Sequence, residues 1–543
     1  MIKKLFSSKI NSITIAAFLV ALSSLLSRFL GIFRDRILGS EFGLGSNLDM
    51  YYASFRIPDL IFNLLVLGAL SSGFVPILTG IIKDKKLIFF KSSNHKIWDL
   101  VNNILNILSL SVIILSIVGI IFAPSLIKII APGFSSEQQM ITSNLARIMF
   151  LSPIFLGISS VLGGVLQSFK RFFVYSLSPV LYNIGIIIGA LFFVPIFGLY
   201  GLAWGVVLGA FMHMSIQFPV VFFLGFKYKP YINLKDKNIR KIGKMMIPRV
   251  MSLGISQINL VVITIIASML ASGSLAVFNF ANNLQTFPVS IFGISFAVAA
   301  FPVLSSIAFD KKELVKSFSK IFRQILFFIM PATVLLLTLR AQIVRVLFGS
   351  GKFDWTDTIL TINTLGFFTI SLFAQASIPL LVRIFYARHN SKTPFIISLI
   401  SVFVNVFLAI VFSKKLGVSG LALAFSLSNI LNFILLWIVL RIELGNMDEI
   451  RILKSATKFC IASLSCGVAV QGAKLLVWKY VNMETFVGIF IHGAIAGIIG
   501  LLVYISFCSL LKCEELDYFW KSIKKRLKFK NVEINDQGEA RGV

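Results

Sequence analysis

Arginine and aspartate side chains at helical spacing near residue 30 are the most informative chemical groups in this sequence. Arg28, Arg34, Asp35 and Arg36 all occur within or at the end of one apolar run. At about 100° per residue, Arg28 and Asp35 lie about 20° apart around a helix, and Arg34 and Arg36 flank Asp35. A guanidinium group binds phosphate through a planar fork of donors. The pattern predicts a cationic stripe with one carboxylate, suited to an anionic, phosphorylated ligand.

A second charged segment follows. Arg56 and Asp59 are three residues apart, so they share one helix face, and Asn63 lies one turn further. Asp49 lies just before this segment. We therefore name as candidate ligand-binding residues Arg28, Arg34, Asp35, Asp49 and Arg56. The alternative for the residues at 34–36 is a structural ion pair, or long side chains that reach toward a water interface.

The second half of the chain offers amides instead of charges at comparable positions. They are Gln257, Asn259, Asn282, Asn283, Gln285, Gln375 and Asn405. We expect most of them to form hydrogen bonds between helices. The charge of the ligand site should therefore be concentrated in the first half of the chain.

The sequence contains few residue patterns typical of an enzyme active site or a metal site. The four cysteines have no C-x-x-C spacing, the four histidines are isolated, and no phosphate-binding glycine loop occurs. We expect no catalytic residue, no metal site and no cofactor. His213 and His492 are expected to be hydrogen-bonded core residues. Asp354 and Asp357 are expected to cap a helix N-terminus.

Composition shows what positions these groups. The chain has 543 residues, is 57% hydrophobic and 13% charged, and has a mean hydropathy of +0.91 and a net charge of +29. A soluble domain carries about 25% charged residues, so this is a polytopic membrane protein. About 20 residues cross the bilayer, and on that basis we predict about 14 transmembrane helices. The first, Ile13 to Phe33, lacks a signal-peptide cleavage site and is expected to be retained.

Basic residues orient the predicted helices. They gather in the loops at 83–96, 227–244 and 311–320, whereas the intervening loops are poor in them. The positive-inside rule then places both termini in the cytoplasm. Six basic residues follow in the tail, where we expect them to lie against the anionic inner leaflet, either as a general anchor or as a specific lipid site: Lys521, Lys524, Lys525, Arg526, Lys528 and Lys530.

Two short motifs recur in the two halves. G-x-x-G-L-A starts at Gly198 and again at Gly417, and a Phe-x-Pro-x-Leu-like segment around Pro76 recurs around Pro302. Six predicted spans separate each pair, which favours a parallel repeat with a pseudo-two-fold axis along the membrane normal. The alternative is that the glycines only mark close helix packing.

This repeat gives the predicted domains, which are two six-helix lobes and two further helices. They are an N-lobe at 1–226, a basic cytoplasmic linker at 227–244, a C-lobe at 245–445, helices 13 and 14 at 446–512 and a basic cytoplasmic tail at 513–543. Two such lobes enclose a central cavity that alternating access can open to either side. Transport is therefore the leading class of function.

Six segments resemble the MurJ (MviN) family of lipid II flippases, in the multidrug, oligosaccharidyl-lipid and polysaccharide exporter superfamily. They are SRFLGIFRD at 27–35, GALSSGFVPIL at 68–78, APGF at 131–134, SPVLYNIG at 178–185, SQIN at 256–259 and RIFYARHNSKTP at 383–394. The resemblance implies fourteen helices, with the last two forming a groove for the lipid tail. It also implies transfer of an undecaprenyl-pyrophosphate-linked glycopeptide from the inner to the outer leaflet for peptidoglycan synthesis.

The resemblance places the family's essential cavity arginines at Arg28 and Arg34, with Asp35 and Asp49 at neighbouring polar positions. The implied partners are lipid II and membrane lipids, with other cell-wall synthesis proteins left open and no nucleic acid. The implied location is the bacterial plasma membrane. Dependence on membrane potential or an ion gradient is left open.

Five positions depart from the family pattern. Phe62 and Asn63 stand where many relatives carry basic residues, and Leu67 stands at a commonly acidic position. Ile263 stands where some relatives carry an aspartate proposed to bind sodium. Asn283 stands where an arginine is usual, and is our candidate for the cavity of the second lobe. Export of another lipid-linked oligosaccharide or of a multidrug-type substrate stays open as the alternative function.

Overall fold

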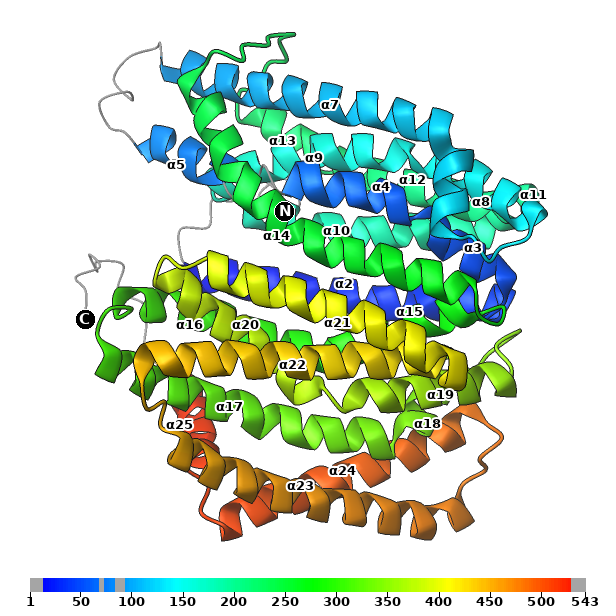
Figure 1. The fold of residues 1–543 in the computed structure, drawn as a ribbon, viewed down its shortest axis with the longest axis vertical. Coiled ribbons are helices and arrows are strands. Elements are labelled where there is room, and N and C mark those ends of the chain that lie inside the picture. Colours follow the sequence, from blue (N-terminus) through cyan, green and yellow to red (C-terminus); the bar gives the residue numbers. More distant parts are fainter. Residues whose placement is uncertain (1–12, 68–72, 84–92, 529–543) are drawn as a thin grey trace. The chain divides into compact units, whose positions relative to one another are not determined.

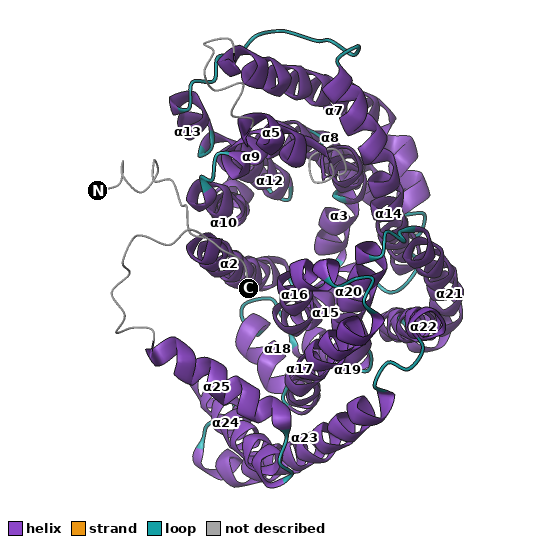
Figure 2. Cartoon of the chain, turned by 90° about the vertical axis from the view of Figure 1, so that its left-hand side faces the viewer, coloured by secondary structure: helices purple, strands orange, loops and turns teal. Residues whose placement is uncertain are grey.

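A computed structural model describes residues 13–67, 73–83 and 93–528 of the chain. Every regular element within these ranges is a helix (Figure 2). Helices are expected because each apolar segment must satisfy its own backbone N–H and C=O groups in lipid. The predicted all-α polytopic membrane fold is confirmed.

Two compact units make up the chain, and each is described by itself. The first comprises Met1–Phe287, Val344–Phe368 and Phe395–Asn432, and the second comprises Pro288–Ile343, Thr369–Pro394 and Phe433–Val543. These units follow spatial contacts, whereas the predicted lobes follow the sequence repeat. The lobe boundaries stay a prediction.

The helices of the first half of the chain belong to the first unit. They are α2 (Ile13–Phe42), α3 (Ser46–Ser54), α4 (Arg56–Ile61), η1 (Phe62–Leu67), α5 (Val75–Lys83), α7 (Ser93–Ile130), α8 (Ser136–Met149), α9 (Leu151–Ser168), α10 (Phe172–Ile188), η3 (Gly189–Phe193), α11 (Val194–Phe197), α12 (Tyr200–Ser215), α13 (Phe218–Phe223) and α14 (Lys237–Ser268).

Five helices have residues in both units, namely α15 (Ser274–Pro288), α18 (Arg340–Phe348), α19 (Trp355–Thr369), α21 (Lys392–Leu416) and α22 (Val418–Leu444). The second unit holds η4 (Val289–Ile294), α16 (Ser295–Ser306), α17 (Lys311–Thr338), α20 (Leu372–Ala387), α23 (Glu449–Val477), η5 (Trp478–Tyr480), α24 (Phe486–Leu510) and α25 (Glu514–Lys528).

Ten helices of the described ranges are long and apolar enough to cross a membrane, or eleven if the pair α19 and α20, bent by 47°, counts as one span. The other three predicted spans have different forms. The first lies on α2, the second is divided among α3, α4, η1 and α5, and the seventh has its apolar part at Leu253–Ser268 of α14. The predicted count of about 14 therefore exceeds the spans found by length and composition.

Glycines bring α10 against α12 in the first unit, and α10 in turn contacts α2 (Figure 1). A Cβ atom at Gly185 would lie 2.2 Å from the Gly209 Cα, and one at Gly189 would lie 2.3 Å from the Gly205 Cα. Small residues of this kind let membrane helices approach closely at the backbone. The packing fixes α10 as a rigid support beside α2.

Left-handed backbone conformations recur in the two halves at nearly constant separation. Lys170 and His389 have φ of 59° and 61°, Gly198 and Gly417 have 59° and 57°, and Gly225 and Gly445 have 97° and 85°. Each pair follows the end of a helix, and the members are 219 or 220 residues apart. The π-helical segments η1 and η4 likewise start 227 residues apart. These matched features support the predicted parallel repeat.

Tight packing is also present at the repeated motif. A Cβ at Gly201 would lie 2.4 Å from the Phe193 backbone, and one at Gly420 would lie 2.4 Å from the Phe412 backbone. Both interpretations of the G-x-x-G-L-A motif, a repeat and a site of close helix packing, therefore apply to these glycines. They allow close packing, and they do so within the same local turn in each half.

Candidate functional site

An ion pair on α2 is the centre of the charged cluster. Arg34 donates from Nε and Nη2 to Asp35 Oδ1, at 3.0 and 2.7 Å. The other carboxylate oxygen, Oδ2, accepts from Asn283 Nδ2 on α15 at 2.7 Å. The Asp35 side chain is 1% exposed and that of Arg34 is 21% exposed. The carboxylate is thus fixed from both sides, whereas the guanidinium remains partly accessible.

Asn183 on α10 links this cluster to the start of the arginine stripe. Its Oδ1 accepts from Arg34 Nη1 at 3.3 Å, and its Nδ2 donates to Ser27 Oγ at 3.2 Å. We did not name Asn183 as a site residue from the sequence. An amide within an otherwise apolar helix was the signal that could have identified it.

Arg28 lines a cavity of about 700 Å³ in the first unit. Its guanidinium has no hydrogen-bond or ion-pair partner among the described residues. The cavity wall also carries hydroxyl, imidazole and amide groups, including those of Ser27, Tyr175, His213 and Gln217. Ser27 therefore lies on this wall and also contacts Asn183, which joins the cavity to the ion pair.

Three residues predicted to have structural roles are confirmed in them. His213 Nδ1 lies 2.7 Å from Ser159 Oγ, and His492 Nε2 lies 3.0 Å from a carbonyl oxygen of α23. Asp354 Oδ1 accepts from the Asp357 backbone N–H at 2.8 Å, close to the start of α19. The cavity position of His213 is an addition to its predicted role.

Arg56 bonds neutral side chains of two other helices. Its Nε donates to Thr264 Oγ1 on α14 at 2.7 Å, and its Nη2 donates to Asn279 Oδ1 on α15 at 3.2 Å. Within the described ranges it forms no ion pair with Asp59. Arg56 thus fastens α4 to α14 and α15. Its predicted contact with a ligand stays a prediction.

Asp49 caps the start of α15. Its two carboxylate oxygens accept from the backbone N–H groups of Gly273 and Ala276, at 2.7 and 2.8 Å. A carboxylate at a helix N-terminus satisfies orphan donors and interacts favourably with the helix dipole. These contacts account for the buried Asp49 without a ligand, so its predicted ligand-binding role also stays a prediction.

Further contacts hold the end of α2 against α18, α19 and the loop between them. The Leu44 N–H donates to Asp357 Oδ2 at 2.9 Å, and the Lys352 N–H donates to the Ser40 carbonyl at 2.8 Å. Arg36 donates from Nη1 to a carbonyl in the last turn of α18 at 2.5 Å. We call these contacts, together with those of Asp49, the end seal. None of the partners in the end seal was predicted from the sequence.

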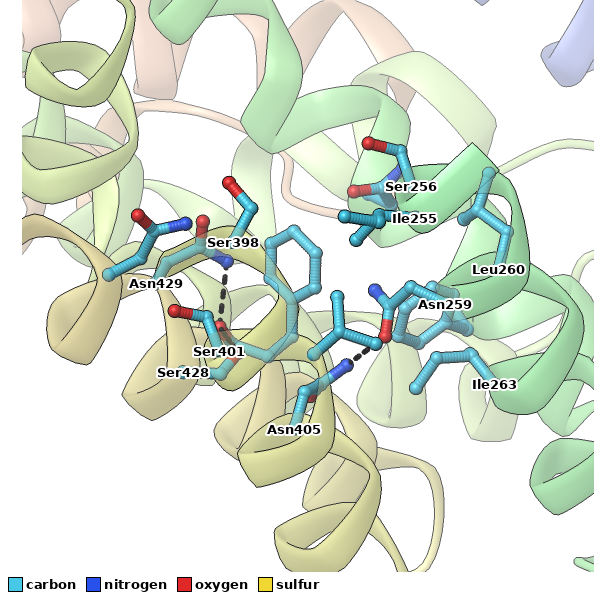
Figure 3. A pocket seen from close by; sticks show the side chains of 15 residues that line it. Ile255, Ser256, Asn259, Leu260, Ile263, Ser398, Ser401, Asn405, Ser428 and Asn429 are labelled. Carbon is cyan, nitrogen blue, oxygen red and sulfur yellow. Dashed lines mark hydrogen bonds between the residues drawn. The ribbon is translucent and has the colours of Figure 1, made fainter. Parts of the chain in front are cut away.

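A second cavity, of about 340 Å³, lies among α14, α15, α21 and α22 (Figure 3). Its described lining residues carry no formal charge. Asn405 Nδ2 donates to Asn259 Oδ1 at 2.7 Å, which confirms the predicted hydrogen bonding between helices for this pair. Ile263 lies on the wall. In the described ranges, no group of three or more His, Cys, Asp or Glu residues is placed to hold a metal ion.

The structure therefore brings together some of the predicted site residues. Arg34, Asp35 and Asn283 form one cluster, and Arg28 lies on the adjoining cavity. Asp49 and Arg56 lie outside the cluster with partners of their own. Within the described part of the chain, this arrangement can offer an anion the Arg28 guanidinium, which has no partner there, and the Arg34 guanidinium, which Asp35 can release.

Comparison with known proteins places the chain in a family. The model of the family described as "Lipid II flippase MurJ" matches residues 38–491. A probable lipid II flippase MurJ of Buchnera aphidicola subsp. Schizaphis graminum is 32% identical over 433 residues, covering 77% of this chain and 81% of that protein. A probable lipid II flippase MurJ of Thermotoga maritima is 28% identical over 499 residues, covering 92% and 96%.

Solved structures agree with the sequence comparison. A lipid II flippase MurJ in an inward closed conformation is similar with a TM-score of 0.73 and 26% identity, covering 91% of this chain and 98% of that one. An inward-facing multidrug resistance transporter of the MATE family shares the fold, with a TM-score of 0.63 and 17% identity, covering 78% and 96%. Since the family model spans most of the sequence, the chain belongs to the lipid II flippase MurJ family.

Proposed function

We propose that this chain transports lipid II, the undecaprenyl-pyrophosphate-linked precursor of peptidoglycan, from the inner to the outer leaflet of the bacterial plasma membrane. Membership of the family supports this function over export of another substrate. Transport requires binding and release and no covalent step, which suits a site made of guanidinium, amide and hydroxyl groups. The basic loops favour a topology with both termini in the cytoplasm.

The guanidinium of Arg28, which has no partner among the described residues, is the observation that carries the proposal. A charged group in a membrane protein is costly unless it faces a polar interior, and Arg28 faces a cavity of about 700 Å³. Hydrogen bonds between arginine and phosphate are among the strong ones, because both groups are charged. Arg28 is therefore the first contact for the pyrophosphate, and the hydroxyl and amide groups of the wall contact the uncharged parts of the ligand.

Arg34 is the second contact, and Asp35 regulates its availability. A pyrophosphate in the cavity competes with Asp35 for Arg34. Because Asn283 and burial hold Asp35 in place, the carboxylate stays next to Arg34 and can reclaim it. That competition would keep binding reversible and assist release into the outer leaflet.

The end seal has a role in the same cycle. It fastens the end of α2 to α19 and to the loop before it, and it fastens α3 to the start of α15. The predicted topology places this end at the outer face, opposite to the basic loops. In alternating access the end seal would open while the inner entrance closes, so that the cavity is exposed to one side at a time.

A membrane potential or an ion gradient would supply the driving force for the cycle. One charge that crosses 100 mV is worth about 2.3 kcal/mol, so an inside-negative potential would help an empty cationic cavity return inward. No cofactor is required by this scheme. Lipid II and membrane lipids are its partners, and contacts with other cell-wall synthesis proteins stay open.

Complementation of cells depleted of their own lipid II flippase tests the proposal. The double variant Arg28→Ala, Arg34→Ala should reach normal membrane levels and fail to support growth. Loss of each charged hydrogen bond costs about 1.5–3 kcal/mol, so each single variant should bind lipid II about 10- to 100-fold more weakly than the wild type. Arg28→Lys keeps the charge and should retain part of the binding.

Arg147→Ala is the matched control, because Arg147 is an exposed arginine that bonds Asn144 on its own helix. It should support growth and bind lipid II normally. Full growth with the double variant would overturn the assignment. Equal affinities for undecaprenyl phosphate and lipid II would show that the pyrophosphate is not the group that the site recognises.

A further inference from the structure

A third cavity, of about 380 Å³, lies in the second unit and is lined by residues of α17, α23, α25 and the turn between α24 and α25. Seven of its described lining residues are arginine, lysine or glutamate. Five are cationic and two are acidic: Arg323, Arg451, Lys454, Lys458, Lys512, Glu514 and Glu515. The cavity therefore has a net charge of about +3 if all seven are ionised at neutral pH.

Both carboxylates of this cavity are already paired with arginines. Arg323 forms an ion pair with Glu515, and these side chains are 5% and 3% exposed. Arg323 also contacts Glu514 at 3.2 Å, and Arg451 bonds the same carboxylate at 2.7 Å. The hydrogen bonds from Arg451 and Arg323 lower the pKa of Glu514, which keeps it anionic at neutral pH. These pairs hold the start of α25 against α17 and α23.

The three lysines of the cavity have no acidic partner among the described residues. Lys454 and Lys512 make no side-chain hydrogen bond or ion pair within the described ranges. Lys458 donates only to the Lys512 carbonyl, at 3.3 Å. One further donor, Arg323 Nε, is buried and also lacks a partner. Three ammonium groups around one cavity repel each other unless an anion lies between them.

Apolar side chains beside the lysines face outward from the same helices. Leu453, next to Lys454, is 70% exposed, and Leu510, two residues before Lys512, is 74% exposed. Both belong to helices that are long and apolar enough to cross a membrane. A ligand that fits here has a phosphate at the cavity and hydrocarbon chains along α23 and α24.

We propose that Lys454, Lys458 and Lys512 bind the phosphate group of an anionic phospholipid in this cavity, with its acyl chains on the apolar surface of α23 and α24. The site is separate from the cavity that contains Arg28, and it uses α25, which lies beyond the residues matched by the family model. The bound lipid would stabilise the attachment of α25 by neutralising the excess positive charge beside the buried ion pair. This role does not depend on which lipid the chain transports.

The backbone conformation at Lys512 allows a variant that removes the charge without straining the fold. Lys512 has φ of 50°, a conformation in which glycine is favoured over residues with a Cβ. Lys512→Gly therefore removes the charge and relieves backbone strain together. Lys454→Ala and Lys458→Ala remove the other two charges from a helix, where alanine is well tolerated.

Retention of spin-labelled phosphatidylglycerol by the full chain in phosphatidylcholine nanodiscs measures the site. The wild type should immobilise phosphatidylglycerol in preference to spin-labelled phosphatidylcholine. Each lysine removed should weaken this preference about fivefold, since a charge near a lipid surface contributes about 1 kcal/mol. Lys512→Gly should do so without a fall in melting temperature.

A control triple variant, Lys237→Ala, Lys241→Ala and Lys244→Ala, removes the same charge from exposed positions of α14 and should keep the preference. Equal loss in the control would show a general attraction to anionic lipid and would overturn the site. Displacement by unlabelled undecaprenyl pyrophosphate at lower concentrations than by phosphatidylglycerol would also overturn it, by assigning the cavity to the transported lipid. An unchanged preference in Lys512→Gly and in the triple lysine variant of the cavity would refute the proposal directly.

Discussion

At Asn283 a neutral amide contacts the buried carboxylate of the candidate site. Asn283 donates to Asp35 at 2.7 Å, and Asp35 in turn holds Arg34. The three side chains together carry no net charge. Arg28 is therefore the excess cation next to this cluster, and pyrophosphate binding should depend strongly on it.

Asn283→Arg should add a second guanidinium that competes for Asp35. Arg34 would then be held less firmly by the carboxylate, and the cluster would gain one positive charge. We expect binding of undecaprenyl pyrophosphate to tighten by about fivefold, the difference between a charged and a neutral hydrogen bond. Release should slow, so that transport measured in vesicles does not rise in proportion.

Asn283→Leu is the matched control, because it leaves Asp35 Oδ2 buried without a donor. This should lower the free energy of unfolding by about 1–3 kcal/mol. Pyrophosphate binding should not become tighter. Weaker pyrophosphate binding by Asn283→Arg than by the wild type would contradict the argument.

Residue spacing predicted part of this site. The positions of Arg28, Arg34 and Asp35 on α2 follow from helical periodicity, and their charge indicated an anionic ligand. The contacts from Asn183 and Asn283 could not be obtained in this way. These residues are remote in sequence, and their side chains meet α2 only through the packing of α10 and α15.

At the scale of elements, the turn before α15 is held by glycine. Gly273 has φ of +89°, and a Cβ there would lie 1.9 Å from the Leu44 carbonyl oxygen. Its N–H also donates to Asp49. The turn thus joins the end seal through its backbone, at a distance that a larger residue cannot reach.

Gly273→Ala should therefore destabilise the end seal. Gly198→Ala is the comparison, because Gly198 has φ of +59° and no atom lies within 4 Å of the position that a Cβ would take. We expect a cost of about 1 kcal/mol at Gly198 and about 3 kcal/mol or more at Gly273. Melting temperatures of the two purified variants measure the difference, and equal values would exclude a steric role for Gly273.

Hydropathy located most of the helices, but it did not predict that the second span is divided into several short helices. The sequence from Ala53 to Ile82 is apolar enough for one helix, but the structure divides its described part among α4, η1 and α5 after the end of α3. Apolar length measures the cost of lipid exposure and carries no information on whether each N–H bonds four or five residues back.

At the scale of the whole molecule, the predicted topology assigns one side of the membrane to the Arg28 cavity and the other to the loop before α19. Gln167 lies on the wall of the Arg28 cavity, near the end of α9, and Lys352 is exposed in the loop before α19. The positive-inside pattern places Gln167 near the cytoplasm and Lys352 at the outer face. The fold class follows from composition, but the division into two compact units does not, because it depends on contacts between distant segments.

Cysteine labelling tests this assignment. In a Cys460→Ser background, which removes the exposed native cysteine, Gln167→Cys should react with a membrane-impermeant maleimide in inside-out vesicles. Lys352→Cys should react in right-side-out vesicles. Preferential labelling of Gln167→Cys from the outside would reverse the proposed orientation or the open side of the cavity.

The matched left-handed residues in the two halves have a consequence for the history of the chain. Lys170 and His389 differ in side chain, yet they share a conformation that glycine adopts more easily. Side chains have diverged at these positions while the backbone torsion was kept. If the two halves descend from one duplicated ancestor, the torsion angles record the duplication more faithfully than the amino acids do, and they can align the halves where sequence identity cannot.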